Sequence, residues 1–285
     1  VGFYAPAQIV RDAREHGAEV RPVDVNHSDW DCTIENKALR LGLRQIKGLR
    51  EADAQTLVAH RGQDYADVSD LWHRSGLGPK VLDRLARADA FASMQLNRRD
   101  ALWAVKGLGD TVLPLFAAAE AREAKQRQNS RPESSGPGGN FQIEPDVTLP
   151  LAQLGEQVID DYAATRLSLK AHPLKLLRRR FQHRGFISNE ALPTVDPDSA
   201  VRLAGLVISR QRPGTASGVI FATLEDETGI ANIIIWPKVF EKFRKVVLRS
   251  RLLGITGVVQ REGRVIHVIA RHLGDYSYLL DELDE

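Results

Sequence analysis

The spacing of hydrophobic residues changes about two thirds of the way along the 285-residue chain. Before residue 190 most apolar positions recur at helical intervals, as in residues 5–17, where Ile9, Val10 and Ala13 share one face, and in residues 151–169. An exception is residues 18–26, where valines alternate with polar residues and predict a short strand. After residue 200 the apolar runs are short and rich in β-branched residues. The pattern predicts a multi-domain α+β protein, helical first and all-β afterwards.

The β-rich part predicts a barrel. Three strand patterns, over residues 201–213, 218–229 and 230–237, precede an amphipathic helix at 238–248, and two more strands join at the turn "REG". Three strands, a helix and two strands is the order of an OB-fold, whose face commonly binds single-stranded nucleic acid. We expect this domain over residues 191–275, with its first strand bent at Gly205. The pattern leaves open whether Ile220 or Phe221 points outward.

Two glycine turns lead into helical patterns within residues 41–110. In "IKGLREAD", Gly48 lies between Lys47 and Arg50; "SGLGPKVLDRL" has Gly76 and Gly78. Unpaired N–H groups at a helix start attract phosphate, and glycine lets the backbone approach closely. The tandem predicts a helix-hairpin-helix domain that binds DNA without reading bases, although ordinary helix caps are the alternative.

These turns differ from the usual motif in one place. Arg50 stands where a second glycine is typical, so the backbone geometry there is open. A third match, with Gly107 and Gly109, runs into Pro114, and we interpret it as a loop.

Charge is unevenly distributed, although the net charge is only +2. Residues 162–189 contain seven Lys or Arg and no acid, which predicts a basic helical bridge over 151–190 facing a polyanion; a solvated face is the alternative. Residues 111–150 predict a flexible linker, and residues 276–285 a solvated acidic tail. The residues predicted to contact DNA are cationic, glycine or aromatic: Lys47, Gly48, Arg50, Gly76, Gly78, Lys80, Arg178, Arg179, Arg180, Arg210, Arg212 and Trp236.

Catalytic and metal-binding patterns are missing from the sequence. The eight histidines do not pair with Cys or carboxylates at metal-ligand spacing, and the three carboxylates at residues 225–227 sit at a predicted turn, where acids are common. We therefore expect no cofactor and no metal in this chain. The single Cys32 excludes a disulfide framework and favours a reducing, cytoplasmic compartment, and no apolar run is long enough for a membrane.

Several segments together resemble one family. "GFYAPAQIVRDAREHGAEVRPVDVNHSDWDCTIE", "LRLGLRQIKGL", "LNRRDALWAVKGLGD" and "DDYAATRLSLKAHPLKLLR" are similar, in this order, to bacterial C-family DNA polymerases (the alpha-subunit family), in particular their error-prone ImuC-type paralogue. The resemblance covers nearly the whole chain apart from residues 120–150. It implies a distal fingers segment at residues 1–40, then the tandem helix-hairpin-helix and OB domains.

The resemblance also implies a function. The chain would be the DNA-binding carboxy-terminal part of a translesion polymerase whose catalytic aspartates, and the Mg²⁺ they bind, lie upstream of Val1, so that alone it is inactive. Lys47, Lys80 and their neighbours would bind duplex, and the bridge and OB face single-stranded template. No clamp-binding peptide occurs between residues 117 and 154, which implies recruitment by accessory translesion proteins. The alternatives are the replicative alpha subunit and a non-enzymatic single-strand-binding or scaffold protein.

Overall fold

The computed structural model describes residues 5–108, 150–214, 218–263 and 265–284. They form two compact units. The hairpin unit is Arg21–Ala152, and the barrel unit combines Val1–Val20 with Gln153–Glu285. Nearly all of the linker predicted over residues 111–150 lies outside the described residues.

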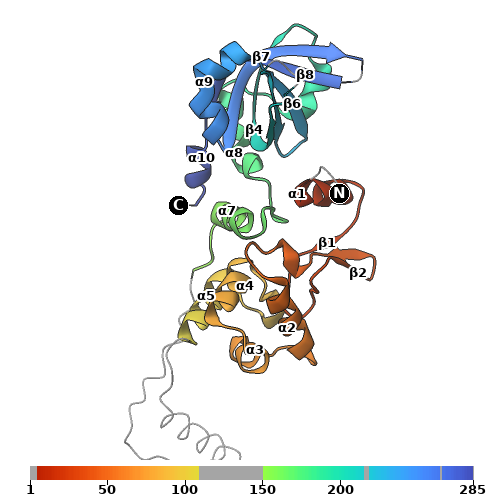
Figure 1. Ribbon diagram of the computed structural model, residues 1–285, viewed down its shortest axis with the longest axis vertical. Coiled ribbons are helices and arrows are strands. Elements are labelled where there is room, and N and C mark those ends of the chain that lie inside the picture. Colours follow the sequence, from red (N-terminus) through yellow and green to blue (C-terminus); the bar gives the residue numbers. More distant parts are fainter. Residues whose placement is uncertain (1–4, 109–149, 215–217, 264, 285) are drawn as a thin grey trace, which may run out of the picture. The chain divides into compact units, whose positions relative to one another are not determined.

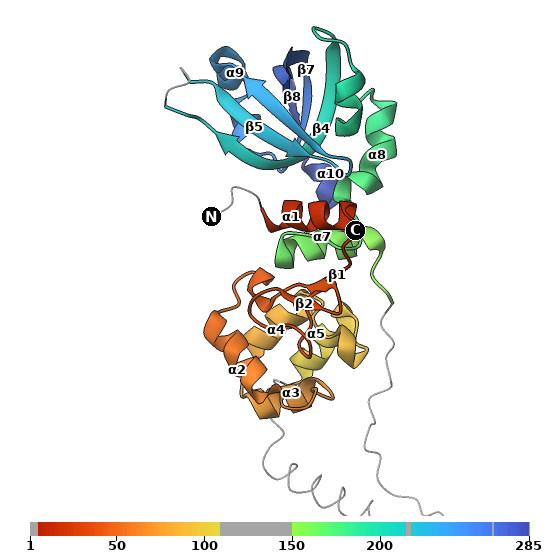
Figure 2. The same cartoon turned by 90° about the vertical axis from the view of Figure 1, so that its right-hand side faces the viewer.

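The hairpin unit consists of short helices around a leucine-rich core (Figure 2). Its elements are β1 (Val20–Arg21), β2 (Thr33–Glu35), β3 (Ala38–Arg40), a 3₁₀ turn (Leu43–Gln45), α2 (Glu51–Arg61), α3 (Val68–Ser75), α4 (Pro79–Arg87), a second 3₁₀ turn (Ala92–Met94) and α5 (Arg98–Gly107). In α4 the helical spacing of Val81, Leu82 and Leu85 buries one face of the helix. The third glycine match, predicted to be a loop, is helical up to Gly107, Leu108 is the C-cap of α5, and the rest of the match lies outside the described residues.

The barrel unit contains a closed five-stranded barrel in the order β4-β5-β6-β8-β7 (Figure 1). The strands are β4 (Ala200–Gln211), β5 (Ile220–Glu225), β6 (Ile230–Ile235), β7 (Leu252–Glu262) and β8 (Val265–Asp275). Alternate residues of β6, Ala231, Ile233 and Ile235, point into the core, as period-two patterning requires. The predicted OB-fold is therefore confirmed.

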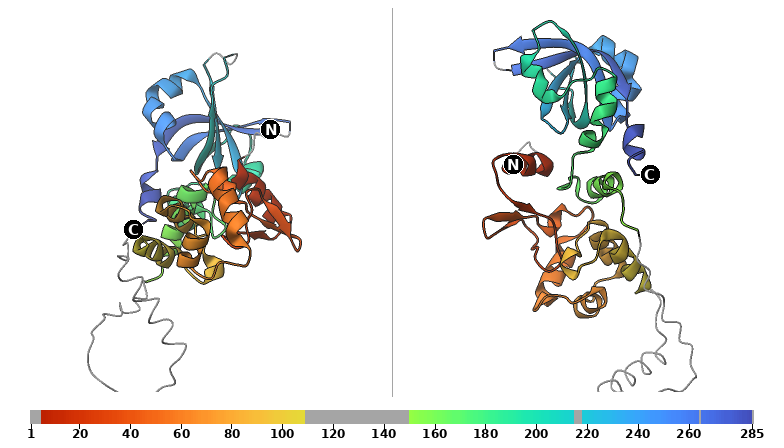
Figure 3. Two further views of the ribbon diagram at one scale, coloured as in Figure 1. Left: turned by 60° about the horizontal axis from the view of Figure 1, so that its bottom comes forward. Right: turned by 180° about the vertical axis from the view of Figure 1, so that it is seen from behind.

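Helices cover the barrel on two sides (Figure 3). The unit contains α1 (Pro6–Glu15), α7 (Leu154–Thr165), α8 (Pro173–His183), a 3₁₀ turn (Asn189–Thr194), α9 (Pro237–Arg249) and α10 (Tyr278–Asp281). Phe240 and Val247 of α9 join the barrel core. A second apolar cluster forms where Leu177 and Phe181 of α8 meet the barrel residues Ala204 and Leu252.

The carboxy-terminal residues also belong to this second cluster. Leu279 and Leu280 of α10 are buried in it. The two acids that follow the leucines form ion pairs, Asp281 with Arg251 and Glu282 with Arg180. The described acids of the predicted solvated tail are therefore exposed, whereas these two leucines are buried because they have an apolar surface to pack against.

Gly205 has a different role from the predicted bend. A Cβ at this position would lie 2.8 Å from the Leu224 Cβ and 2.9 Å from the Glu225 carbonyl oxygen, so glycine permits close approach of β4 and β5. The irregularity in pairing between these strands falls later, between Val207 and Ser209. The bulge therefore lies beyond the glycine.

His172 caps the start of α8 in a buried position. Its Nδ1 accepts the Leu174 N–H at 3.2 Å, which leaves Nε2 as the protonated nitrogen of the neutral ring. Burial lowers the pKa of His172 to about 4, a stronger effect than the attraction of the proton to Glu227 and Asp226. The ring is therefore neutral at physiological pH.

This burial predicts a loss of stability in acid. Because the folded pKa lies below the ordinary value of about 6.5, the unfolded chain binds the proton first, and stability should fall by up to about 3 kcal/mol between pH 6.5 and pH 4. Asparagine retains the cap but does not titrate, so His172→Asn should flatten this part of the profile. Urea denaturation of both proteins across the pH range measures the difference. Identical profiles would contradict the predicted role of His172.

Candidate nucleic-acid interface

The two glycine turns of the hairpin unit have matching backbones. Gly48 and Gly76 adopt φ of +77° and +64°, in the left-handed region that favours glycine. Leu49 and Leu77, next in sequence, are both buried. The positions after them are extended, with φ of −89° at Arg50 and −69° at Gly78.

This geometry resolves the question raised by Arg50. The position of the second glycine, occupied by Arg50 in one turn and Gly78 in the other, has a negative φ in both, so any residue fits there without strain. The first turn does depart from a full helical hairpin on its other side, because it is entered through the 3₁₀ turn Leu43–Gln45 in place of a helix.

The two helix starts differ in charge. At α2, Glu51 and Asp53 occupy the first turn, and the Arg50 guanidinium binds the Asp53 carboxylate at 2.9 and 3.0 Å. At α4 the first turn contains no acid and Lys80 is exposed. Nothing lies within 4 Å of a Cβ built at Gly78. The α4 start is thus the more favourable of the two for a phosphate.

Arg84 is a cation that the sequence analysis missed. It projects from α4, and its Nε lies 3.4 Å from a Cβ built on Gly48, so its guanidinium covers the first turn. Among the described residues Arg84 has no ion pair. Lys47, exposed beside Gly48, is also without one. Helix α4 therefore supplies both the open start of the second turn and a cation for the first, a contact that only the folded chain reveals.

The three bridge arginines have three different environments. Arg178 is largely buried and donates to Glu227 at 2.5 and 2.7 Å and to Asp226 at 2.8 Å. Arg180 pairs with Glu282. Arg179 is exposed and without an ion pair among the described residues. The prediction that Arg178 contacts DNA does not fit its placement, because its guanidinium is already bound to two carboxylates.

Phe221 of β5 and Trp236, directly after β6, are two exposed aromatic residues of the barrel unit. Ile220 is buried, whereas Phe221 points outward with 38% of its surface exposed, between Gln211 of β4 and Ile234 of β6. Trp236 precedes α9 and is 50% exposed. Phe221 was missed as a site residue because the apolar run of β5 does not show which alternate face is buried.

The two barrel arginines predicted to contact DNA differ in whether their guanidinium groups are already bound within the protein. Arg210 donates to the Ser250 carbonyl and so links β4 to the end of α9. Arg212 is exposed, and its Nη2 lies 3.2 Å from a Cβ built at Gly218. Arg212 is therefore the better placed to meet a ligand.

No group of three or more potential metal ligands occurs in the described part of the chain. The carboxylates at residues 225–227 are instead bound by arginines, Glu225 by Arg11 and the other two by Arg178. Among these same residues, no helix has the length and apolar character to cross a bilayer.

Comparisons with known families match both units. Residues 17–101 match the helix-hairpin-helix motif, and residues 201–275 match the OB-fold nucleic acid binding domain. The first match includes both glycine turns and Arg84, and the second includes Phe221 and Trp236.

Curated relatives match almost the entire chain. It is 50% identical to the error-prone DNA polymerase of Ruegeria pomeroyi, over 99% of this chain and 24% of that protein. It is 48% identical to error-prone DNA polymerase 1 of Rhizobium meliloti, over 98% of this chain and 26% of that protein. The chain thus spans about a quarter of the length of these relatives.

The backbone angles predict different costs for the two glycines of the second turn. Gly76→Ala should destabilise the protein by about 1–2 kcal/mol, because alanine is strained at positive φ. Gly78→Ala should stay within about 0.5 kcal/mol, since a weaker cap is offset by a less flexible unfolded chain. Urea denaturation measures both variants. Equal losses would mean that the first glycine is not needed for its conformation.

The bridge arginines predict a second contrast. Arg178→Ala leaves two acids without their cation, one of them the fully buried Asp226, and should cost about 3 kcal/mol. Arg179→Ala is the matched control and should change stability by less than about 0.5 kcal/mol. Thermal and urea unfolding test the pair. A stable Arg178→Ala protein that binds DNA more weakly would restore the original prediction for this residue.

Proposed function

The chain belongs to the error-prone DNA polymerases, of which it spans about a quarter of the length, and we propose that it holds the primer-template of a polymerase that copies damaged DNA. In this proposal the hairpin unit binds the phosphates of duplex DNA and the barrel binds the single-stranded template. The observation that carries it is the pair of left-handed glycine turns, beside which lie cations that have no ion pair among the residues the structure describes.

The duplex contact rests on Lys47, Lys80 and Arg84. Lys47 and Arg84 flank the Gly48 turn, and Lys80 lies in the first turn of α4 where no acid opposes an anion. Arg50 is a secondary contributor, because a phosphate must compete with Asp53 for its guanidinium. Contacts of this kind position the backbone of DNA and carry no base information.

The single-strand contact rests on the barrel. Phe221 and Trp236 offer exposed aromatic surface on which bases of any sequence can stack. Arg212 and Arg179 are exposed cations of the same unit that can meet the strand's phosphates.

The remaining activities are proposals for the longer protein. We infer that nucleotide transfer, with the Mg²⁺ it requires, is carried out by parts of the polymerase that this chain does not include, and that accessory translesion proteins recruit it within the cytoplasm. The names of the relatives favour this role over the replicative paralogue and over a non-enzymatic scaffold.

A salt titration of duplex binding tests the proposal. In fluorescence anisotropy, Lys47→Ala with Arg84→Ala should weaken binding equally for unrelated sequences. The pair should also lower the log–log salt slope by about 1–2, because each phosphate contact contributes roughly 0.9. Arg50→Ala is the matched control, an exposed cation of the same turn that is already paired, and should change the slope less.

The stability of the double variant must remain near that of the parent protein, since neither Lys47 nor Arg84 has an ion pair among the described residues, and a surface ion pair would contribute only about 0–1 kcal/mol. If the folded double variant bound duplex DNA with unchanged affinity and salt slope, both glycine turns would be interpreted as helix caps only. If Arg50→Ala lowered the salt slope more than the substitution of Arg84 did, the phosphate would instead contact Arg50, on the other side of the turn.

A further inference from the structure

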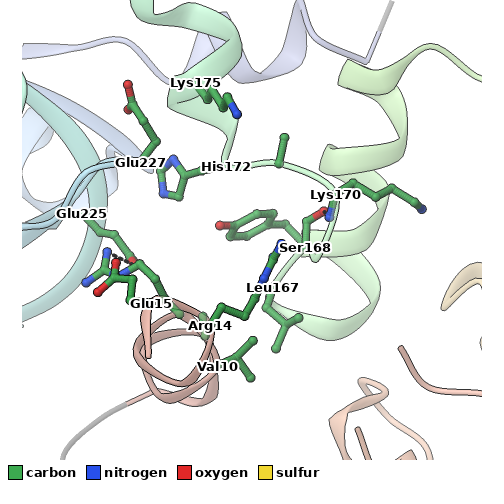
Figure 4. Close-up of a pocket in the computed structure, with 14 residues that line it drawn as sticks. Val10, Arg14, Glu15, Leu167, Ser168, Lys170, His172, Lys175, Glu225 and Glu227 are labelled. Atoms are coloured by element: carbon green, nitrogen blue, oxygen red, sulfur yellow. Dashed lines mark hydrogen bonds and ion pairs between the residues drawn. The ribbon is translucent and has the colours of Figure 1, made fainter. Parts of the chain in front are cut away.

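A cavity of about 390 Å³ lies inside the barrel unit, between α1, the residues joining α7 to α8, and the β5–β6 end of the barrel. Figure 4 shows the His172 ring facing this hollow, with Val10 and Arg14 of α1 opposite it. The volume lies within the range of small-molecule sites and is more than ten times the roughly 30 Å³ that one water occupies.

Most of the charges around the cavity are already neutralised. Of the lining carboxylates, Glu225 binds Arg11 at 2.7 Å, Glu227 binds Arg178 at 2.5 Å, and Glu15 lies 3.5 Å from Arg11. Lys170 and the Ser168 hydroxyl both donate to Asp161, at 3.3 and 2.7 Å. These groups form the walls of the cavity and are not available to a ligand without exchange.

Four donors are left over. The buried Nε2 of His172 has no hydrogen-bond partner in the described part of the chain, and its Nδ1 is used in the helix cap. The Tyr162 hydroxyl makes no hydrogen bond with the described residues, while its ring meets His172 edge-on at 6.3 Å. Lys175 is exposed and without an ion pair among these residues, and Arg14 makes one hydrogen bond, to the Leu169 carbonyl at 3.0 Å.

The neutral donors and the cations occupy different parts of the site. His172 and Tyr162 are held uncharged, because burial lowers the pKa of the first and raises that of the second. Arg14 and Lys175 belong to the exposed part of the lining. Ala7, Val10, Leu167 and Ala171 form the apolar walls of the cavity.

We propose that this cavity binds a nucleotide, with its base against the apolar walls and its phosphate attracted by the exposed cations of the lining, Arg14 and Lys175. The acceptor atoms of a base would satisfy the Nε2–H of His172 and the Tyr162 hydroxyl, since a buried donor without a partner is costly. An inorganic anion alone would fill little of the volume. The nucleotide is either free or one residue of a single strand, and the site is separate from the glycine turns.

Calorimetric titration of the chain with deoxyadenosine monophosphate tests the site. Tyr162→Phe removes only a hydroxyl that makes no hydrogen bond with the described residues, and His172→Asn removes the Nε2 donor while retaining the cap. Each should weaken binding about threefold to tenfold, the range of one hydrogen bond. Lys175→Ala should weaken it as well, whereas Lys106→Ala, an exposed lysine of the hairpin unit, should not.

A competition experiment distinguishes a free nucleotide from a nucleotide that is part of a DNA strand. Displacement by a single-stranded oligonucleotide would identify a DNA residue as the ligand, and its absence would identify a free nucleotide; both support the site. The inference is overturned if the monophosphate does not bind, if inorganic phosphate binds equally well, or if Tyr162→Phe and His172→Asn both bind as the parent does. The Lys47 and Arg84 variant should bind the monophosphate normally, so failure of the duplex proposal would leave this result intact.

Discussion

The buried carboxylate of Asp226 holds the barrel unit together at one end. Its two oxygens accept five hydrogen bonds, from the Arg178 guanidinium, the Asn189 N–H, the Thr228 N–H and hydroxyl, and the Gly229 N–H. The side chain is fully buried, so any missing donor would leave a desolvated charge. The turn between β5 and β6, the 3₁₀ turn after α8, and α8 itself are therefore fixed around a single residue.

This arrangement explains why the arginine run at residues 178–180 does not form a uniformly basic surface. The acids that neutralise Arg178 and Arg180 lie about 50 and 100 residues further along the chain. Within the run itself no acid is visible, so the sequence predicts a uniform positive face. Folding divides it into one structural arginine, one surface ion pair and one unpaired cation, because ion pairs form between groups that are distant in sequence.

The parts of the fold that the sequence predicted are those in which spacing alone decides the outcome. The short apolar strand at β6, the helical period of α4 and the strand–helix order of the barrel are all local, and all are present. The site was less predictable. Arg84 reaches the Gly48 turn from another helix, and Phe221 lies within the four apolar residues 219–222, which do not show which face is buried. The cavity near His172 is lined by residues 7–15 and by residues between 162 and 227, which are far apart in the sequence, so no local pattern could reveal it.

The matching backbones of the two glycine turns bear on how this motif is recognised in other sequences. Only the first glycine has a conformation that other residues avoid, whereas the second position is ordinary extended chain in both turns. A search pattern that requires glycine at both positions rejects the turn at Gly48, although its geometry is the same. Such a pattern should require the first glycine and the buried leucine after it. It should accept any residue at the position of the second glycine, which is free to change during evolution.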